Sequence, residues 1–346
     1  MSIIISPLFK QFFSGRIWMG LDYKLIKSEL EAKYSAKVEI ISFEKLKESL
    51  NTIPENAVLF YSSVYNPEYL RFIQDTVKYI ALKRPDIILI PDEHQLNSLE
   101  NKGYQELYKD LLGIEKVAGK YYGDIDEVIR ENNLVFPFVL KLLKGALSSG
   151  VQLIKNEQEL ENFRDQVKKK SLKEKAAYVL NKRNSFKKDS NLAPVTHLLK
   201  QNFEDVFTKR IPVVVQDFVP GLECDYKVLV FGDKYFVVKR GIRENDFRAS
   251  GSGKLQWDVP PNEVLDYAKE LKKVFKVPYI SLDIGIDNVN NCYLFEFQGT
   301  AFGPATLTAG DKFFYIESDE WKIKEGKFNL EEEYAYAINH FINENS

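Results

Sequence analysis

The chain has 346 residues, and its 48 lysines and arginines nearly balance its 50 aspartates and glutamates, for a formal net charge of −2. This length predicts two or three structural units, and 45% apolar with 28% charged residues is typical of a globular protein. The charge balance argues against a dedicated nucleic-acid binder, which is usually basic. Two cysteines exclude a disulfide scaffold and a multi-cysteine metal site.

No run of residues approaches the roughly 18 consecutive apolar residues that a membrane helix requires. The apolar start of the chain is interrupted by Pro7 and Lys10, and it lacks the basic segment and the cleavage site of a signal peptide. We therefore expect a cytoplasmic protein without membrane insertion.

The first ninety or so residues alternate between short apolar runs and segments with helical spacing. Strands are predicted at 1–6, 38–43, 57–62 and 87–90, and helices at 25–34 and 68–83. Short apolar strands that alternate with helices indicate an α/β unit with a largely parallel sheet.

After Pro91 the pattern changes. A helix is predicted at 101–112, ended by Gly113. Strands at 136–141 and 151–154 flank the loop GALSSG, which predicts a β-hairpin with a flexible tip. From residue 211 onward strands dominate, with predicted strands at 211–218, 226–231, 234–240, 279–287 and 292–298 and helices at 263–275 and 330–343.

Residues 164–189 form an unusually basic stretch. They include ten basic and three acidic side chains, a local charge of +7 that leaves the rest of the chain at −9. The simplest interpretation is a solvated helix face followed by an insertion. The alternative is a lid or a docking surface for a polyanionic substrate.

Two features of the middle of the chain suit a nucleotide. Lys141 ends a strand beside the Gly/Ser loop, where its ammonium group and exposed backbone N–H groups could hold polyphosphate oxygens. The run VVVQDFVPG at 213–221 would present backbone N–H and C=O groups to a flat ligand such as adenine. Each feature has a purely structural alternative, since glycine-rich hairpins and core strands that end in a turn are common.

A third feature is cationic. Lys239 and Arg240 end one strand, and Arg248 follows before a second flexible run at 250–253. Several cations around one cleft offset the charge of a phosphoryl group in transfer. The alternative is a solvated hairpin whose charges are incidental.

The fourth feature is a set of oxygen donors on two strands. In YISLDIGID the apolar residues alternate with polar ones, so Asp283 lies on the face away from the apolar side. In LFEFQG, Glu296 and Gln298 point opposite to Phe295 and Phe297. If the strands are antiparallel neighbours, Asp283, Glu296 and Gln298 come together as ligands suited to Mg²⁺. A single carboxylate on a strand usually faces solvent, but the pairing favours a metal site.

The order of these motifs resembles the ATP-grasp superfamily, and within it the glutathione synthetase and ribosomal-protein glutamate ligase branch, over residues 95 to 310. The resemblance implies an α/β protein that is α+β in its ATP-grasp part. A Rossmann-like pre-ATP-grasp domain would span 1–95. The linker helix and small subdomain, with a basic insertion at 164–210, would span 96–212. The large subdomain, with the metal site and a C-terminal helix, would span 213–346.

The resemblance also implies roles for single residues. Lys102 and Lys141 would contact the ATP phosphates, and the loop that carries Ser148 and Ser149 would close over them. The adenine would be held by the backbone of the hinge formed by Gln216, Asp217, Phe218 and Val219, and the ribose would lie near Glu223 or Asp225. Lys239, Arg248 and Ser250 would lie at the nucleotide, and Arg240 beside the γ-phosphate. Arg240, Arg248 and Lys141 are the expected catalytic residues, and Asp283, Glu296 and Gln298 the magnesium ligands.

Two departures from the family pattern bear on function. Gln298 stands where the family usually has asparagine, which keeps the carbonyl oxygen on a longer stem. The Asn-x-x-Pro-Gly continuation is absent and is replaced by 299–304, a segment that borders the acceptor site in relatives. Substrate identity therefore does not transfer. Among the histidines, His94 is the candidate for that pocket, and a structural or surface role is the simpler interpretation for His94, His197 and His340.

The implied activity is an ATP-dependent carboxylate–amine ligase that works through an acyl phosphate. Its cofactors would be ATP and two Mg²⁺ ions, for which Mn²⁺ could substitute. Its partners would be an amine and the carboxylate of a small molecule, a peptide or a glycan precursor, and family habit adds a homodimer. The alternatives are a kinase that phosphorylates a hydroxyl and an ATP-binding regulator without turnover.

Overall fold

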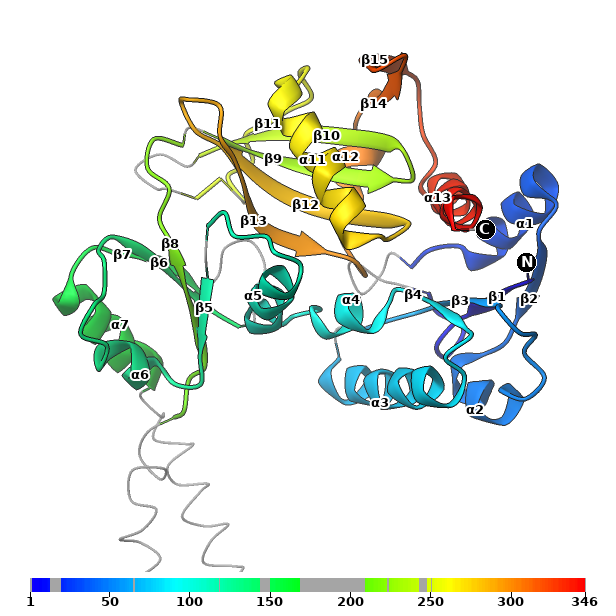
Figure 1. The fold of residues 1–346 in the computed structure, drawn as a ribbon, viewed down its shortest axis with the longest axis horizontal. Helices are drawn as coiled ribbons and strands as arrows, with labels where there is room; N and C mark the ends of the chain where they lie inside the picture. Colours follow the sequence, from blue (N-terminus) through cyan, green and yellow to red (C-terminus); the bar gives the residue numbers. More distant parts are fainter. Residues whose placement is uncertain are drawn as a thin grey trace, which may run out of the picture. The chain divides into compact units, whose positions relative to one another are not determined.

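A computed structural model describes residues 2–12, 20–64, 66–117, 119–143, 150–168, 209–222, 224–242, 248–249 and 251–345 (Figure 1). The chain forms two compact units. One unit combines the chain up to Val117 with the chain from Val219 onward, and the other consists of the residues between them. Among the described helices, none combines the length and the apolar composition that crossing a bilayer would require.

The N-terminal part contains a parallel sheet, as predicted. Its strand order is β2-β1-β3-β4, and every pair is parallel. The elements are β1 (Ser2–Ser6), α1 (Tyr23–Tyr34), β2 (Lys37–Ile40), η1 (Phe43–Lys45), α2 (Leu46–Ser49), β3 (Val58–Tyr61), α3 (Pro67–Lys83), β4 (Ile88–Ile90) and α4 (Glu93–Asn97). The strand expected at 38–43 ends at Ile40 because Phe43 begins a 3-10 turn and buries its ring below the sheet.

Local sequence explains where the long helices begin. Asn66 precedes α3, and its side chain accepts hydrogen bonds from the N–H groups of Glu68 and Tyr69, while Pro67 occupies the first turn. Asp22 caps α1 in the same way. One apolar stripe of α3, which includes Ile73, then packs under the sheet.

The second large sheet is antiparallel, with strand order β13-β12-β9-β10-β14-β15, and β11 pairs with β10. Its elements and neighbours are α5 (Lys102–Leu111), β9 (Cys224–Phe231), β10 (Lys234–Gly241), β11 (Leu255–Gln256), α11 (Asn262–Phe275), β12 (Tyr279–Ile286), β13 (Cys292–Gln298), α12 (Ala305–Thr308), β14 (Lys312–Glu317), β15 (Glu320–Glu325) and α13 (Leu330–Glu344). Helices α5 and α11 cover one face, where Tyr108 and Phe275 pack on Phe297.

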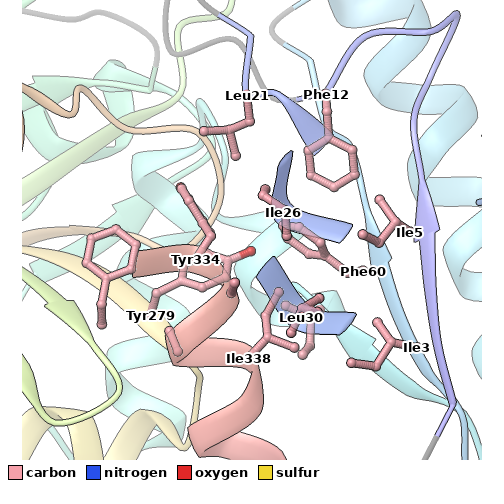
Figure 2. Close-up of a cluster of buried hydrophobic side chains, with 14 of the residues drawn as sticks. Ile3, Ile5, Phe12, Leu21, Ile26, Leu30, Phe60, Tyr279, Tyr334 and Ile338 are labelled. Atoms are coloured by element: carbon pink, nitrogen blue, oxygen red, sulfur yellow. The ribbon is translucent and has the colours of Figure 1, made fainter. Parts of the chain in front are cut away.

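The opposite face of this sheet shares a core with the N-terminal sheet. Ile3, Ile5 and Phe60 of the N-terminal strands belong to the same buried cluster as Tyr279 of β12 and Tyr334 of α13 (Figure 2). The ring centroids of Tyr279 and Tyr334 are 4.7 Å apart, and both side chains are buried. The two sheets of this unit are therefore joined by one apolar core, which the C-terminal helix completes.

The other unit is a four-stranded antiparallel sheet in the order β5-β8-β6-β7. Its elements are β5 (Gly119–Tyr122), α6 (Ile125–Ile129), β6 (Phe138–Leu142), β7 (Val151–Ile154), α7 (Glu157–Lys168) and β8 (Val213–Asp217). The expected β6–β7 hairpin is present, with Lys141 opposite Val151. The sequence grouped 213 onward with the C-terminal part, whereas β8 pairs with β5 and β6, and the unit ends at Phe218. An apolar run reveals a buried strand but not its partners.

Two residues within the basic insertion, Lys168 and Lys209, meet. The backbone N–H of Lys209 donates to the carbonyl of Lys168 at 3.3 Å. Asp124 contacts the chain on both sides of residues 169–208, since it pairs with the Lys168 ammonium at 2.9 Å and with Arg210 at 3.3 Å. The start of the basic stretch lies on α7, as expected for a helix face, and residues 169–208 lie outside the described residues.

Candidate active site

Six charged residues of the larger unit form a connected cluster. Asp283 of β12 stands opposite Lys227 of β9 on one side and opposite Glu296 of β13 on the other. Arg240 of β10 stands opposite Asp225, two residues before Lys227 on β9. Because side chains two apart on a strand share a face, the strand registers bring these groups together above the sheet. Lys102, the first residue of α5, completes the cluster.

Arg240 is the centre of this cluster. Its Nε and Nη2 donate to the two carboxylate oxygens of Asp225 at 2.5 and 2.8 Å, a bidentate contact. The same Nη2 lies 2.9 Å from Oδ2 of Asp283. The side chain is buried, so these carboxylates replace the water that the guanidinium loses. Burial disfavours the charge, but Asp283 and Asp225 outweigh it and raise the pKa of Arg240.

The two aspartates differ because their neighbours differ. Burial raises the pKa of Asp283, but the charges of Arg240 and Lys227, whose Nζ lies 3.2 Å away, outweigh it and hold that pKa at about 2. Asp225 has Arg240 as its close cationic partner and Asp283 as a nearby like charge. Burial therefore prevails there and raises the pKa of Asp225 to about 6. One fixed anion and one carboxylate that titrates in the mildly acidic range thus share a single guanidinium.

Glu296 provides the second carboxylate of the predicted metal site. Its Oε1 lies 3.9 Å from the Lys102 ammonium and accepts a hydrogen bond from the Gln298 amide at 3.4 Å. Asp283 and Glu296 are direct cross-strand partners, an arrangement of like charges that needs a compensating cation.

The donor atoms of Asp283, Glu296 and Gln298 fit Mg²⁺. Two carboxylates and one amide carbonyl offer only hard oxygen ligands, which fit Mg²⁺ and leave positions for water or phosphate. Within the described residues there is no group of three or more acidic, histidine or cysteine side chains placed to hold a metal. Asp283, Glu296 and Gln298 would therefore hold the ion together with water or phosphate oxygens, which would complete its coordination.

Phe295 departs from the predicted alternation. The β12–β13 register shifts between Asp283 and Ile284, so Phe295 is the extra residue of a β-bulge. A Cβ placed on Gly285 would lie 2.3 Å from the Phe295 ring, which puts this ring on the face of Asp283 rather than in the core with Phe297. A simple count of alternating residues cannot reveal a bulge. Lys227, by contrast, could have been found from its spacing to Asp225.

The remaining predicted residues are not part of this cluster. Lys239 stands opposite Tyr226, whose side chain is in the core under α11, so it lies on the other face of β10 from Arg240. Arg248 is half-buried beside Ala249. Ser148, Ser149, Glu223 and Ser250 lie outside the described residues. Their contacts with a nucleotide stay predictions.

The predicted nucleotide residues of the other unit are described within that unit. Lys141 is buried on β6, and its neighbours across the sheet are Val151 and Val214. Gln216 is also buried, on β8, whereas Asp217 is exposed. The predicted hinge coincides with the boundary between the units, which falls between Phe218 and Val219.

Comparison with known proteins identifies the fold. No protein-family model and no curated protein matches the sequence. D-cycloserine synthetase DcsG aligns with a TM-score of 0.52 at 10% identity, over 97% of this chain and 98% of its own. The ADP complex of N5-carboxyaminoimidazole ribonucleotide synthetase aligns with a TM-score of 0.51 at 13% identity, over 90% and 73%. The ATP-grasp ligase PsnB, complexed with a precursor peptide and AMPPNP, has a TM-score of 0.48 at 14% identity, over 87% and 89%.

The chain has the ATP-grasp fold. The expectation drawn from the motif order is thereby confirmed at the level of architecture, with a parallel N-terminal sheet followed by antiparallel sheets. Within this ATP-grasp fold the charged cluster occupies the strands that carry the recognised motifs, CDYKVLVFGDKYFVVKR, LDIGID and LFEFQG.

Proposed function

We propose that the protein is an ATP- and Mg²⁺-dependent carboxylate–amine ligase that acts through an acyl phosphate. The observation that carries the proposal is the cluster around Arg240. Three acidic and two basic groups lie on one sheet face of an ATP-grasp fold, and Lys102 of α5 adds a third basic group. Two of the acidic groups, Asp283 and Glu296, are direct cross-strand neighbours, and Gln298, whose amide contacts Glu296, could add a third oxygen ligand.

The charges of the cluster allow its cations to exchange their carboxylate partners for phosphate groups when Mg²⁺ binds. Without ligands, the three cations Lys102, Lys227 and Arg240 neutralise three carboxylates. Mg²⁺ on Asp283, Glu296 and Gln298 would neutralise these acids and polarise phosphate oxygens. The cations are then available to the phosphates. Asp225 keeps two guanidinium N–H groups engaged, so Arg240 stays oriented as negative charge develops on the transferring phosphoryl group.

The proposed reaction has two steps. A carboxylate oxygen of the first substrate attacks the γ-phosphorus of ATP, and ADP leaves with the electrons of the broken P–O bond. The amine nitrogen of the second substrate then attacks the acyl carbon, orthophosphate leaves, and the proton of the amine passes to water. The chain's part in both steps is to align the reactants and to offset charge. Lys141, Arg248 and the hinge 216–219 are proposed to hold the nucleotide.

The substrates are proposed by class only. Two structural neighbours with TM-scores above 0.5 are named synthetases that make D-cycloserine and N5-carboxyaminoimidazole ribonucleotide, both small molecules. We therefore propose a small carboxylate and a small amine, with a peptide or a glycan precursor as the larger alternative.

The test is a screen of paired carboxylates and amines for release of orthophosphate and ADP. A ligase releases both only when the two substrates are present together. ADP with a phosphorylated acceptor and no orthophosphate would instead identify a kinase, and tight ATP binding without turnover across the panel would identify a regulator.

Glu296→Ala should abolish turnover and leave the unfolding transition in place. Glu325→Ala, on the exposed strand β15, is the matched control and should keep full activity. Normal turnover in Glu296→Ala would refute the metal assignment.

A further inference from the structure

Helix α3 carries a second apolar stripe besides the one that packs under the N-terminal sheet. This second stripe is on the exposed side of the helix and consists of Tyr69, Phe72, Tyr79 and Leu82. Leu82 is 73% exposed, and the three aromatic side chains are 42–45% exposed. A surface helix usually carries charged and polar residues on this side. The helix therefore offers water an apolar surface that the rest of its unit covers only in part.

Phe9 extends this stripe at one end. Its ring is 52% exposed and stands edge-on to Tyr69, with centroids 5.2 Å apart. Large apolar side chains of this kind contribute about 150–250 Å² each when they are fully covered, so these five expose on the order of 500 Å² together. A monomeric protein rarely exposes a larger apolar patch, and patches of this size are often functional. Two such patches in contact would remove about 1,000 Å² from water, the size at which a specific interface becomes plausible.

The exposed stripe is symmetric about the middle of α3. Phe72 and Tyr79 lie equally far along the sequence from a point between residues 75 and 76. Tyr69 and Leu82 are also equally far from that point. Two copies of α3 that pack antiparallel about a twofold axis through this point would therefore place apolar side chains opposite apolar side chains along the whole stripe. A twofold interface between identical chains requires such a surface, one that is complementary to itself.

The charges beside the stripe follow the same symmetry. Glu68 and Lys83 are equally far from the midpoint, so each would lie opposite its counterpart of opposite sign on the partner helix. Neither forms an ion pair within the described part of the chain, whereas Arg71 and Asp75 neutralise each other at 3.0 Å. A parallel pair of helices would instead bring Glu68 to Glu68 and Lys83 to Lys83. The charges therefore favour the antiparallel arrangement and fix its register.

This surface lies apart from the candidate active site. Helix α3 packs on the face of the N-terminal sheet that carries Ile4 and Leu59. Ile3 and Phe60 point to the opposite face, into the core shared with the antiparallel sheet that carries the cluster around Arg240. A contact through α3 would therefore leave the active-site strands uncovered.

We propose that the exposed face of α3, together with Phe9, binds a second copy of this chain, with the two α3 helices antiparallel about a twofold axis. Leu82 then packs on the partner's Tyr69 and Phe9, and Phe72 packs on the partner's Tyr79. Glu68 pairs with the partner's Lys83 at both ends of the interface. The inference does not depend on the proposed ligase activity.

The first test is sedimentation velocity of the full chain over micromolar concentrations. We expect a species of twice the chain mass of 40.1 kDa. Leu82→Glu should raise the dissociation constant by about a hundredfold, because a twofold interface loses the same contact twice, at about tenfold each. Leu111→Glu is the matched control, since Leu111 is 69% exposed and also lies at the C-terminal end of a helix, α5. It should leave the dissociation constant unchanged.

The second test exchanges the charges. Glu68→Lys and Lys83→Glu should each weaken the dimer about three- to tenfold, because each places like charges opposite one another twice. The double variant should restore the affinity. An effect on the helix itself would not be restored, because the two residues are about 22 Å apart along one α3 and cannot contact each other within it.

The affinity for a non-hydrolysable ATP analogue should be unchanged in every variant, which shows that the fold is intact. The inference is overturned if the unmodified chain sediments as a monomer throughout this range, if Leu82→Glu weakens the dimer no more than Leu111→Glu does, or if the double charge exchange fails to restore the affinity lost in the single variants.

Discussion

Replacing Asp225 with alanine should lower the free energy of unfolding of the larger unit by about 3 kcal/mol. Arg240 is buried, and Asp225 accepts two of its three charge-assisted contacts, at 2.5 and 2.8 Å. Removing one partner of a buried ion pair costs about 3–5 kcal/mol, because a charge is left without compensation. Asp283 still contacts Nη2 at 2.9 Å, which places the expected loss at the lower end.

Tryptophan fluorescence during urea unfolding provides a selective assay. Trp257 and Trp321 belong to the larger unit, and the sequence has no tryptophan within 118–218, which contains the described residues of the smaller unit. The fluorescence change therefore does not report the smaller unit, even if the two units unfold separately. Asp225→Asn, which keeps an acceptor oxygen but removes the charge, should lose less than Asp225→Ala.

The double variant with Arg240→Met tests the cause. Without the buried cation, Asp225→Ala should cost little or even stabilise, because it then removes an unpaired buried acid. A loss below about 1 kcal/mol for Asp225→Ala alone, the value typical of an exposed ion pair, would refute the reasoning.

Four further predictions concern activity, stability and binding. Arg240→Lys should lower kcat by about 10²–10³-fold with little change in the KM for ATP, because one ammonium group cannot reproduce the fork between Asp225 and Asp283; steady-state kinetics with near-normal kcat would contradict this. The kcat/KM of the unmodified enzyme should fall as the pH drops below about 6, since protonated Asp225 holds Arg240 less firmly, and Asp225→Asn should lack this acid limb. The raised pKa also means that the Asp225 contribution to stability decreases as the pH rises from about 4 to about 6, which pH-dependent urea midpoints would detect. Replacing residues 171–206 with a short Gly/Ser linker should preserve the affinity for ATP, measured by calorimetry. A short linker suffices because the Lys209 N–H already donates to the Lys168 carbonyl at 3.3 Å. Loss of activity with the acceptor substrate alone would instead support a docking role for the basic stretch.

The sequence predicts the strands of the site well because their pattern is regular. Strict alternation in YISLDIGID places Asp283 on the polar face, and the structure pairs it with Glu296 as expected. The parallel N-terminal sheet also follows from short apolar runs between capped helices. The prediction omits strand β15, although EWKIKE alternates Trp321 and Ile323 with charged residues, because two apolar side chains in a short, largely charged segment are a weak signal.

Other features depend on contacts between distant parts of the chain. The position of Phe295 depends on a register shift between two strands, which leaves no mark in the local sequence pattern. Likewise, nothing in 213–218 indicates that β8 pairs with strands from before the insertion. The nucleotide roles of Lys141 and the hinge, and the expected homodimer, stay predictions.

The core shared by the N-terminal strands and the C-terminal helix has a consequence for biosynthesis. Ile3, Ile5 and Phe60 leave the ribosome early, but Tyr334 and Ile338, which cover them, are made only near the end of translation. At roughly 5–20 residues per second, the interval between Phe60 and Tyr334 is on the order of tens of seconds. During that time an apolar sheet face remains uncovered in the nascent chain. The N-terminal half of this protein is therefore expected to engage chaperones as it emerges, and ribosome stalling before α13 should leave it sensitive to aggregation.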